Sequence, residues 1–182
     1  MIHYIYIPGL GDRFDPLRRA ALQRWKRRDV QVTLVPMRWA DNTETYEQKY
    51  ARVVAVITQA AAQKTILVGE SAGGAMALLT FCRQQQAVHS VVTVCGYNKG
   101  AAEIGQGYRR SSPALYPLLR ELDKVLPGLP TAARQGITTI YSLHDSVVSP
   151  RHSQVDGAHE TVLRTPGHLF TIARILLVGL SN

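Results

Sequence analysis

A five-residue G-x-S-x-G segment, residues 69–73, joins an apolar run to a stretch of small, helix-forming residues. The apolar run covers residues 65–68 and the small-residue stretch covers residues 74–82. This order predicts a strand, a tight turn and a helix, because small neighbours let the helix approach the strand. A serine in so tight a turn is held in a strained backbone conformation, and its hydroxyl projects beyond the sheet edge. Ser71 is therefore a candidate nucleophile, and the alternative is a serine in an ordinary glycine-rich turn.

Short apolar segments alternate with segments of helical periodicity along the 182 residues. The expected strands are residues 2–7, 31–35, 65–68, 90–94, 137–143 and 160–164. The expected helices are residues 15–28, 43–62 and 74–82, a segment that begins at Ser112-Pro113, and residues 169–180. Strict alternation predicts an α/β fold with a doubly wound parallel sheet. No repeat or linker interrupts the pattern, so we expect one domain over residues 1–182, with 97–136 as its longest, lid-like insertion.

A serine hydroxyl is a poor nucleophile unless a base removes its proton, and the base needs an acid that fixes its tautomer. Asp145 and His168 each follow the end of an expected strand, as Ser71 does. The carboxyl ends of parallel strands meet at one edge of a sheet, so these three side chains are expected to gather there. We therefore predict Ser71 as nucleophile, Asp145 as acid and His168 as base.

Other titratable residues are alternatives for the same roles. His144 and His152 remain as alternative bases, whereas His3 lies inside the first strand and His159 before the sixth, at the opposite edge. Glu70 is the nearest alternative acid, but its place directly before the nucleophile favours a structural contact.

Composition limits the class of protein. Hydrophobic residues make up 46% of the chain, which is enough for a sizeable core. The apolar start is short, has no basic flank before it and runs into Pro8-Gly9, so it predicts a strand and not a signal peptide. Cys82 and Cys95 lie in apolar surroundings without metal-ligand spacing, which favours buried free thiols. We expect a cytoplasmic protein without a membrane span.

The net charge of +8 is concentrated near the N-terminus, at Arg18, Arg19, Arg24, Lys26, Arg27 and Arg28. Phe14, Leu17, Ala21 and Trp25 recur at helical spacing in the same segment. The basic residues are therefore expected to form the solvated side of a helix whose apolar side packs on the sheet. A weak contact with an anionic surface is the alternative, and no nucleic-acid partner is expected.

With nucleophile, acid and base in this chain order, the sequence resembles the α/β-hydrolase family over nearly its whole length. Residues 69–73 match the nucleophile elbow, and residues 144–150 resemble the loop that carries the acid, an aspartate followed by a small apolar pair and a proline. Pro166-Gly167-His168 stands where the base-bearing loop is expected. The resemblance implies six parallel strands in the order 2-1-3-4-5-6, a minimal form of the fold that lacks the two leading strands.

The same resemblance implies a serine hydrolase that cleaves carboxylic esters or thioesters through an acyl-enzyme. It assigns the oxyanion hole to the backbone N–H groups of Leu10 and Ala72, although Pro8 stands where many members carry a histidine. A small-molecule substrate would meet a rather open site with a modest apolar wall from Leu10, Leu115 and Tyr116. No metal or cofactor is implied, and the oligomeric state is not predicted.

Two other functions stay open at this stage. One is a binding or interaction protein that keeps the hydrolase fold without turnover, and the other is an anionic-surface binder that uses the basic segment. A nucleotide-binding turn at residues 9–11 is disfavoured, because Phe14 occupies the place of the third glycine and no acidic residue closes the second strand.

Overall fold

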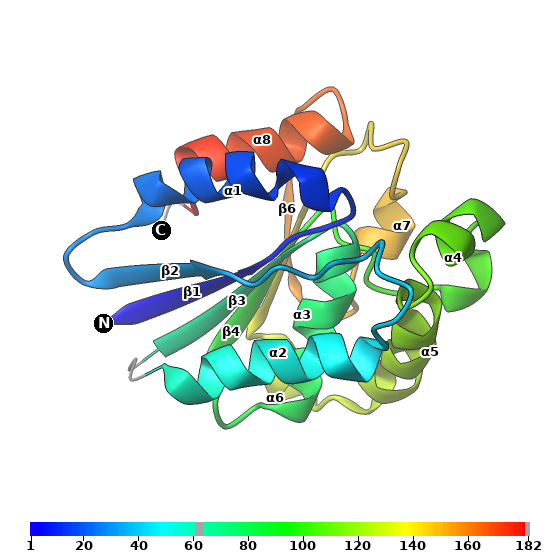
Figure 1. The fold of residues 1–182 in the computed structure, drawn as a ribbon, viewed down its shortest axis with the longest axis horizontal. Helices are drawn as coiled ribbons and strands as arrows, with labels where there is room; N and C mark the ends of the chain where they lie inside the picture. The colour runs from blue at the N-terminus through cyan, green and yellow to red at the C-terminus, as the bar shows by residue number, and fades with distance from the viewer. Residues whose placement is uncertain (61–63, 181–182) are drawn as a thin grey trace.

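The computed structural model describes residues 1–60 and 64–180. Six strands form one parallel sheet in the order β2-β1-β3-β4-β5-β6 (Figure 1). The strands are β1 (Ile2–Ile7), β2 (Val30–Leu34), β3 (Lys64–Glu70), β4 (Ser90–Val94), β5 (Ile137–Tyr141) and β6 (His159–Val162). The predicted fold class and strand order are confirmed, and each strand lies within a few residues of its expected place.

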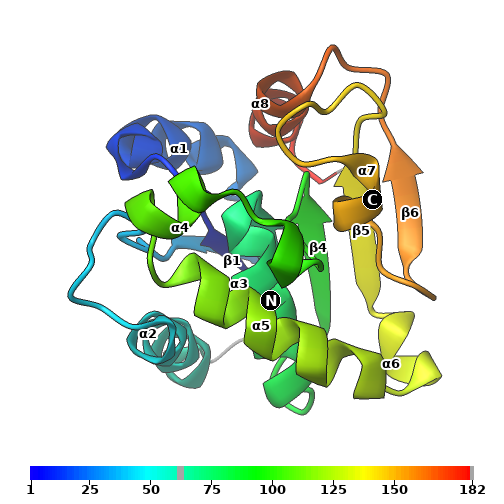
Figure 2. The ribbon, with the colours of Figure 1, turned by 90° about the vertical axis from the view of Figure 1, so that its right-hand side faces the viewer.

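Helices cover both faces of the sheet. On one face lie α1 (Asp15–Leu22) and α8 (His168–Val178), and on the other lie α2 (Tyr46–Gln59), α3 (Ala72–Arg83), α5 (Leu115–Val125) and α6 (Thr131–Arg134) (Figures 1 and 2). Two short helices, α4 (Gln106–Ser111) and α7 (Pro150–Ser153), lie at the carboxyl edge of the strands, toward the viewer in Figure 2. Among the described residues, no helix combines the length and apolar character needed to cross a bilayer.

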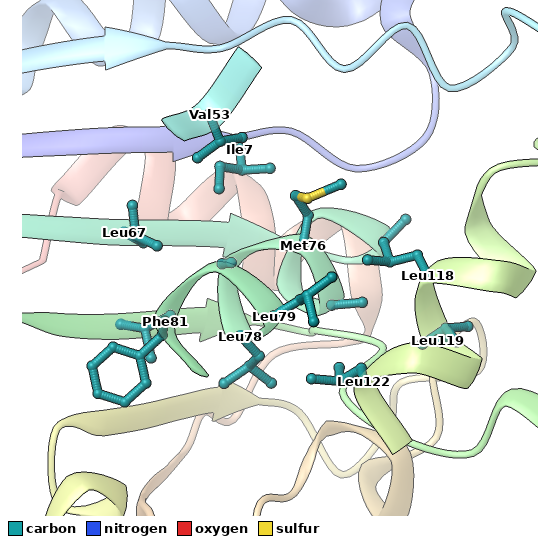
Figure 3. Packing of buried hydrophobic residues seen from close by; sticks show 14 of the residues in the cluster. Ile7, Val53, Leu67, Met76, Leu78, Leu79, Phe81, Leu118, Leu119 and Leu122 are labelled. Atoms are coloured by element: carbon teal, nitrogen blue, oxygen red, sulfur yellow. The ribbon is translucent and has the colours of Figure 1, made fainter. Parts of the chain in front are cut away.

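The larger hydrophobic core lies between the sheet and helices α2, α3 and α5. Residues 72–81 of α3 are all buried, because the helix is covered by the sheet on one side and by α5 on the other. Figure 3 shows Leu118 and Leu122 of α5 facing Met76 and Leu79 of α3. The helix predicted for the segment that begins at Ser112-Pro113 is present, although it begins at Leu115.

A smaller cluster lies between the sheet and helices α1 and α8. Trp25 sits at its centre, where its ring packs edge-on against Tyr4 and Tyr6 of β1. Its Nε1 donates a hydrogen bond to the Leu176 carbonyl of α8, 3.0 Å away. This contact ties the C-terminal helix to the segment that follows α1.

The N-terminal helix differs from the prediction in length and in orientation. It ends at Leu22, and a 3₁₀ turn (Gln23–Trp25) follows, because Lys26 is extended and leads into β2. Phe14 and Leu17 are exposed, whereas Arg18, expected on the solvated side, is buried. The predicted assignment of faces was wrong at these positions, since a buried carboxylate attracts Arg18 inward.

Smaller differences concern element ends. Helix α2 begins at Tyr46, where Thr45 and Gln48 form a capping box, instead of at residue 43. Its predicted end at residues 61–62 lies outside the described residues. Strand β6 begins at His159, so this histidine lies in the strand and not before it.

Candidate active site

The turn between β3 and α3 holds Ser71 in a strained conformation. Its φ of 49° and ψ of −122° lie in a region that side-chain-bearing residues rarely adopt. The Ser71 N–H donates to the Val94 carbonyl (3.0 Å), and its own carbonyl accepts from the amides of Gly74 and Tyr97 (2.9 Å each). These hydrogen bonds hold the turn at the end of the central strands, as the sequence predicted.

Glycines on both sides of Ser71 permit this turn. A Cβ at Gly73 would collide with the Ile7 carbonyl, and a Cβ at Gly69 would collide with backbone atoms of Gly73. The chain therefore needs glycine at both positions to bring α3 against β1 and β3.

Asp145 and His168 form a buried pair beside this turn. The Asp145 Oδ2 and His168 Nδ1 atoms lie 2.7 Å apart, and Asp145 Oδ1 accepts from the amides of Val147 and Val148 at 2.9 Å each. Burial disfavours the carboxylate, but the hydrogen bonds from His168 and Val148 outweigh it and lower the pKa of Asp145 below its usual value. An anionic acceptor at Nδ1 leaves Nε2 as the ring nitrogen able to take up a proton.

Ser71 and His168 line one cavity at the carboxyl edge of the sheet, and Asp145 lies behind the imidazole. The alternative bases lie elsewhere. His144 is exposed, and His152 of α7 stacks on Tyr97 with ring centroids 4.9 Å apart. Neither of these two histidines lines the cavity. The structure thus brings together the three residues that the sequence grouped and separates the other candidates from them.

The loop after β1 lies directly against the turn that carries Ser71. A Cβ on Gly9 would fall 2.7 Å from the Ser71 Cβ, so only glycine allows this approach. Leu10 and Ala72 both line the cavity next to Ser71. Ala72 is the first residue of α3, so its amide has no acceptor within the helix.

A buried polar network fastens this loop to β3. The Glu70 carboxylate accepts hydrogen bonds from the Gly9 amide (3.1 Å), the Tyr6 hydroxyl and the Arg18 guanidinium. Arg18 also donates to the carbonyl groups of Leu10 (3.3 Å) and Gly11 (2.9 Å). Glu70 thus makes the structural contact expected of it, and the loop is held from both sides.

Two further features belong to the network. Asp15 accepts a hydrogen bond from Arg18 at 2.9 Å. Burial, then the adjacent Glu70 carboxylate, raises the pKa of Tyr6 well above its usual value, so Tyr6 remains a hydroxyl donor. Sequence reasoning missed Arg18, because helical periodicity placed it among solvated basic residues. The signal that could have revealed the buried position of Arg18 is Glu70. Its carboxylate ends a central strand, where it must be buried and needs a cation.

Neither a protein-family model nor a curated protein matches the sequence. Solved structures do match the fold. A lipase-esterase related protein from Clostridium acetobutylicum superposes with a TM-score of 0.65 and 13% identity, over 97% of this chain and 92% of that one. The methylesterase MES16 from Arabidopsis superposes with a TM-score of 0.65 and 14% identity, over 98% of this chain and 96% of that one. A metagenome-derived lipolytic enzyme superposes with a TM-score of 0.69 and 13% identity, over 96% of this chain and 90% of that one.

This protein has the α/β-hydrolase fold. Within that fold, its cavity of about 780 Å³ opens from Ser71 between α1, α8 and the segment after β4. Leu10 and Leu115, two of the predicted substrate contacts, line it, while the third, Tyr116, is not among its lining residues. The Tyr116 ring instead lies under the Arg109 guanidinium, whose central carbon is 3.9 Å from the ring centroid.

The candidate site has one group of potential metal ligands among the described residues, formed by Cys95, Asp145 and His168. Their ligand atoms lie within 4.8 Å of one another, but the Asp145–His168 hydrogen bond already uses two of them. Burial, then the charge of Asp145, raises the pKa of the Cys95 thiol, which disfavours the thiolate that a metal requires. This donor set does not suit a metal ion. Cys82 and Cys95 both carry free thiols, as predicted, but Cys95 is buried and Cys82 is only half-buried.

Proposed function

We propose that this protein is a serine hydrolase that cleaves carboxylic esters or thioesters of small molecules through an acyl-enzyme. The observation that carries the proposal is the hydrogen-bonded Asp145–His168 pair, which shares a cavity edge with the strained Ser71. A structural role alone does not account for a strained serine, an imidazole held through Nδ1 and a buried carboxylate at the same edge.

In the proposed reaction, His168 Nε2 removes the proton of the Ser71 hydroxyl as its oxygen attacks the substrate carbonyl. The resulting imidazolium is stabilised by the Asp145 carboxylate. It then gives the proton to the departing alcohol or thiol, and the acyl group remains on Ser71. In the second half, His168 activates a water molecule, which releases the acid and restores the free serine.

The tetrahedral intermediates carry a negative oxygen, which needs donors already in place. We assign this role to the backbone N–H groups of Leu10 and Ala72. The first belongs to a loop fixed by Gly9, Glu70 and Arg18, and the second begins a helix whose N-terminus favours negative charge. Rigid donors of this kind require no reorganisation during the reaction.

The structural neighbours support hydrolysis as the reaction class, since they include a lipase-esterase related protein, a methylesterase and a lipolytic enzyme. A role as an anionic-surface binder gains no comparable support. Arg18, one of the basic residues that suggested it, is paired inside the protein with Glu70.

Labelling by a fluorophosphonate probe tests the proposal, because this reagent forms a bond with an activated serine. The wild-type protein should be labelled and should hydrolyse para-nitrophenyl acetate. Ser71→Ala should abolish both, with a fall in turnover of up to about a million-fold. The matched control is Ser146→Ala, an exposed serine beside Asp145, which should retain both. Labelling that persists in Ser71→Ala would exclude Ser71 as the nucleophile.

A further inference from the structure

Beyond the catalytic residues, the cavity continues along the sheet face that α1 and α8 cover. These helices lie beside each other above the sheet (Figures 1 and 2). Both line the cavity that begins at Ser71. We call this part the α1–α8 groove and define it by Leu17 and Ala21 of α1 with Leu169, Ala173 and Leu177 of α8.

The groove is apolar and open to solvent. Leu17, Leu169 and Leu177 are 70%, 74% and 56% exposed, although all three belong to its lining. Single exposed leucines are ordinary, but an apolar surface that continues from a nucleophile marks a place where a ligand lies. Leu118, Leu119 and Leu122 of α5, on the opposite face, are by contrast completely buried.

The lining of the groove matches a hydrocarbon chain better than a polar ligand. Helices α1 and α8, both described in full, contribute one charged side chain to the lining, Arg18, and its guanidinium is already bound by Glu70. Arg24, which follows α1, adds an exposed charge. A polar ligand would lose hydrogen bonds with water and gain few in return.

The groove is also long enough to select for chain length. Leu169 and Leu177 are eight positions apart on α8, which corresponds to about 12 Å along the helix. Each methylene buried against such a wall strengthens binding by about fourfold. Several methylenes together would change specificity by orders of magnitude.

We infer that the α1–α8 groove binds the hydrocarbon chain of the substrate, so that the physiological substrates are esters with a medium-length or long aliphatic chain. This inference rests on the proposed function and specifies its substrate class. It extends the apolar wall formed by Leu10 and Leu115 to α1 and α8, and it leaves Tyr116 out.

The test compares two substitutions on the same helix. Ala173→Trp fills the groove at an exposed position, so the larger side chain needs no repacking of the core. Phe170→Trp is the matched control, because Phe170 is 64% exposed on α8 and does not line the cavity. For each protein, kcat/KM is measured with two pairs of esters. Para-nitrophenyl acetate and para-nitrophenyl octanoate differ in the acyl chain, and ethyl acetate and octyl acetate differ in the alcohol chain.

The wild-type protein should prefer at least one of the two long-chain esters over its short-chain counterpart by at least about tenfold. Ala173→Trp should reduce that ratio by about 10- to 100-fold, while Phe170→Trp should keep it. No preference for either chain, or a preference that Ala173→Trp leaves intact, would overturn the inference.

A binding measurement separates this result from a failure of the proposed function. Equilibrium dialysis of labelled dodecanoate against the Ser71→Ala protein needs no turnover. Binding that is weakened by adding Ala173→Trp, but not by adding Phe170→Trp, would support the groove even if no ester were cleaved. Absence of dodecanoate binding would contradict the inference that the groove binds a hydrocarbon chain. Light scattering provides a further check, since a dimer that Ala173→Trp dissociates would show that a second copy of the chain occupies the groove.

Discussion

The two faces of the sheet are both apolar, yet they are covered differently. On one face, α3 is enclosed between the sheet and α5, and side chains such as Met76 and Leu118 are completely buried. On the other face, α1 and α8 bury one side of each helix and leave Leu17, Leu169 and Leu177 in contact with solvent. Ser71 and His168 open onto this second face. The difference indicates that the first face provides stability and the second provides access to Ser71.

This comparison predicts that chemistry and stability can be separated by substitution. The largest effect is expected for Asp145→Asn, which keeps the size of the side chain and an oxygen for the amides of Val147 and Val148. The variant should lose about four orders of magnitude in turnover, because the imidazole adopts the wrong tautomer. Ester turnover and circular dichroism, measured on the same sample, provide the test. A folded variant with near-normal turnover would place the acid elsewhere.

The Arg18–Glu70 ion pair links helix α1, on the open face, to strand β3 of the sheet. Arg18→Met should lower the free energy of unfolding by about 3–5 kcal/mol, because it leaves the Glu70 carboxylate buried without its cation. Arg19→Met is the matched control on the exposed side of α1 and should change it by less than about 0.5 kcal/mol. Urea denaturation measures both.

Adding Glu70→Gln to Arg18→Met tests the cause of that loss. The double variant should recover part of the stability, since the unpaired charge is gone. Equal losses for Arg18→Met and Arg19→Met would show that the pair contributes no more than a surface charge.

Leucines on the two faces give a direct comparison of packing. Leu118→Ala, at a side chain with 0% exposure, should cost about 2–5 kcal/mol because it leaves a cavity. Leu177→Ala, on the open face, should cost less than about 0.5 kcal/mol. Thermal and urea unfolding of the two variants measure the difference. Similar losses would mean that α8 is packed as tightly as α5 in solution and would contradict the distinction between the faces.

The smallest expected effect is a change in the free energy of unfolding at low pH. Because the pKa of Asp145 is lower in the folded protein than its unfolded value of about 3.9, its ionisation stabilises the fold above that pH. The contribution is lost as the pH falls through the folded value. The difference in the free energy of unfolding between wild type and Asp145→Asn should therefore narrow between about pH 5 and pH 3. A difference that stays constant over this range would show that the carboxylate gains nothing from His168 and Val148.

Much of the architecture could be predicted from local patterns. The expected ranges of β1 and β4 match the observed strands residue for residue, because a buried parallel strand is a continuous apolar run. The turn at Ser71 was equally recognisable, since few residues other than glycine allow such close contact between a helix and a strand. The grouping of Ser71, Asp145 and His168 followed from one rule, that the carboxyl ends of parallel strands meet at one edge of the sheet.

The N-terminal helix shows where local patterns fail. Periodicity correctly separated apolar from basic positions between residues 14 and 28, but it could not tell which apolar residues would be covered. Arg18 lies inside because Glu70, 52 positions later in the chain, offers it a buried carboxylate. Leu17 stays exposed even though α8 lies beside α1, which the pattern of residues 14–28 does not reveal.

The sequence by itself determined the strands, the strained serine and the set of groups at the sheet edge, because each depends on residues that are near neighbours or on the common direction of the strands. Only the tertiary structure decided that Arg18 and Glu70 fix the loop of Leu10 and that an open groove runs from Ser71 between α1 and α8. The physical reason is that burial and pairing are properties of two surfaces together. The residue pattern of one segment indicates which side chains could be buried. Which of them are buried depends on how closely another segment packs against it.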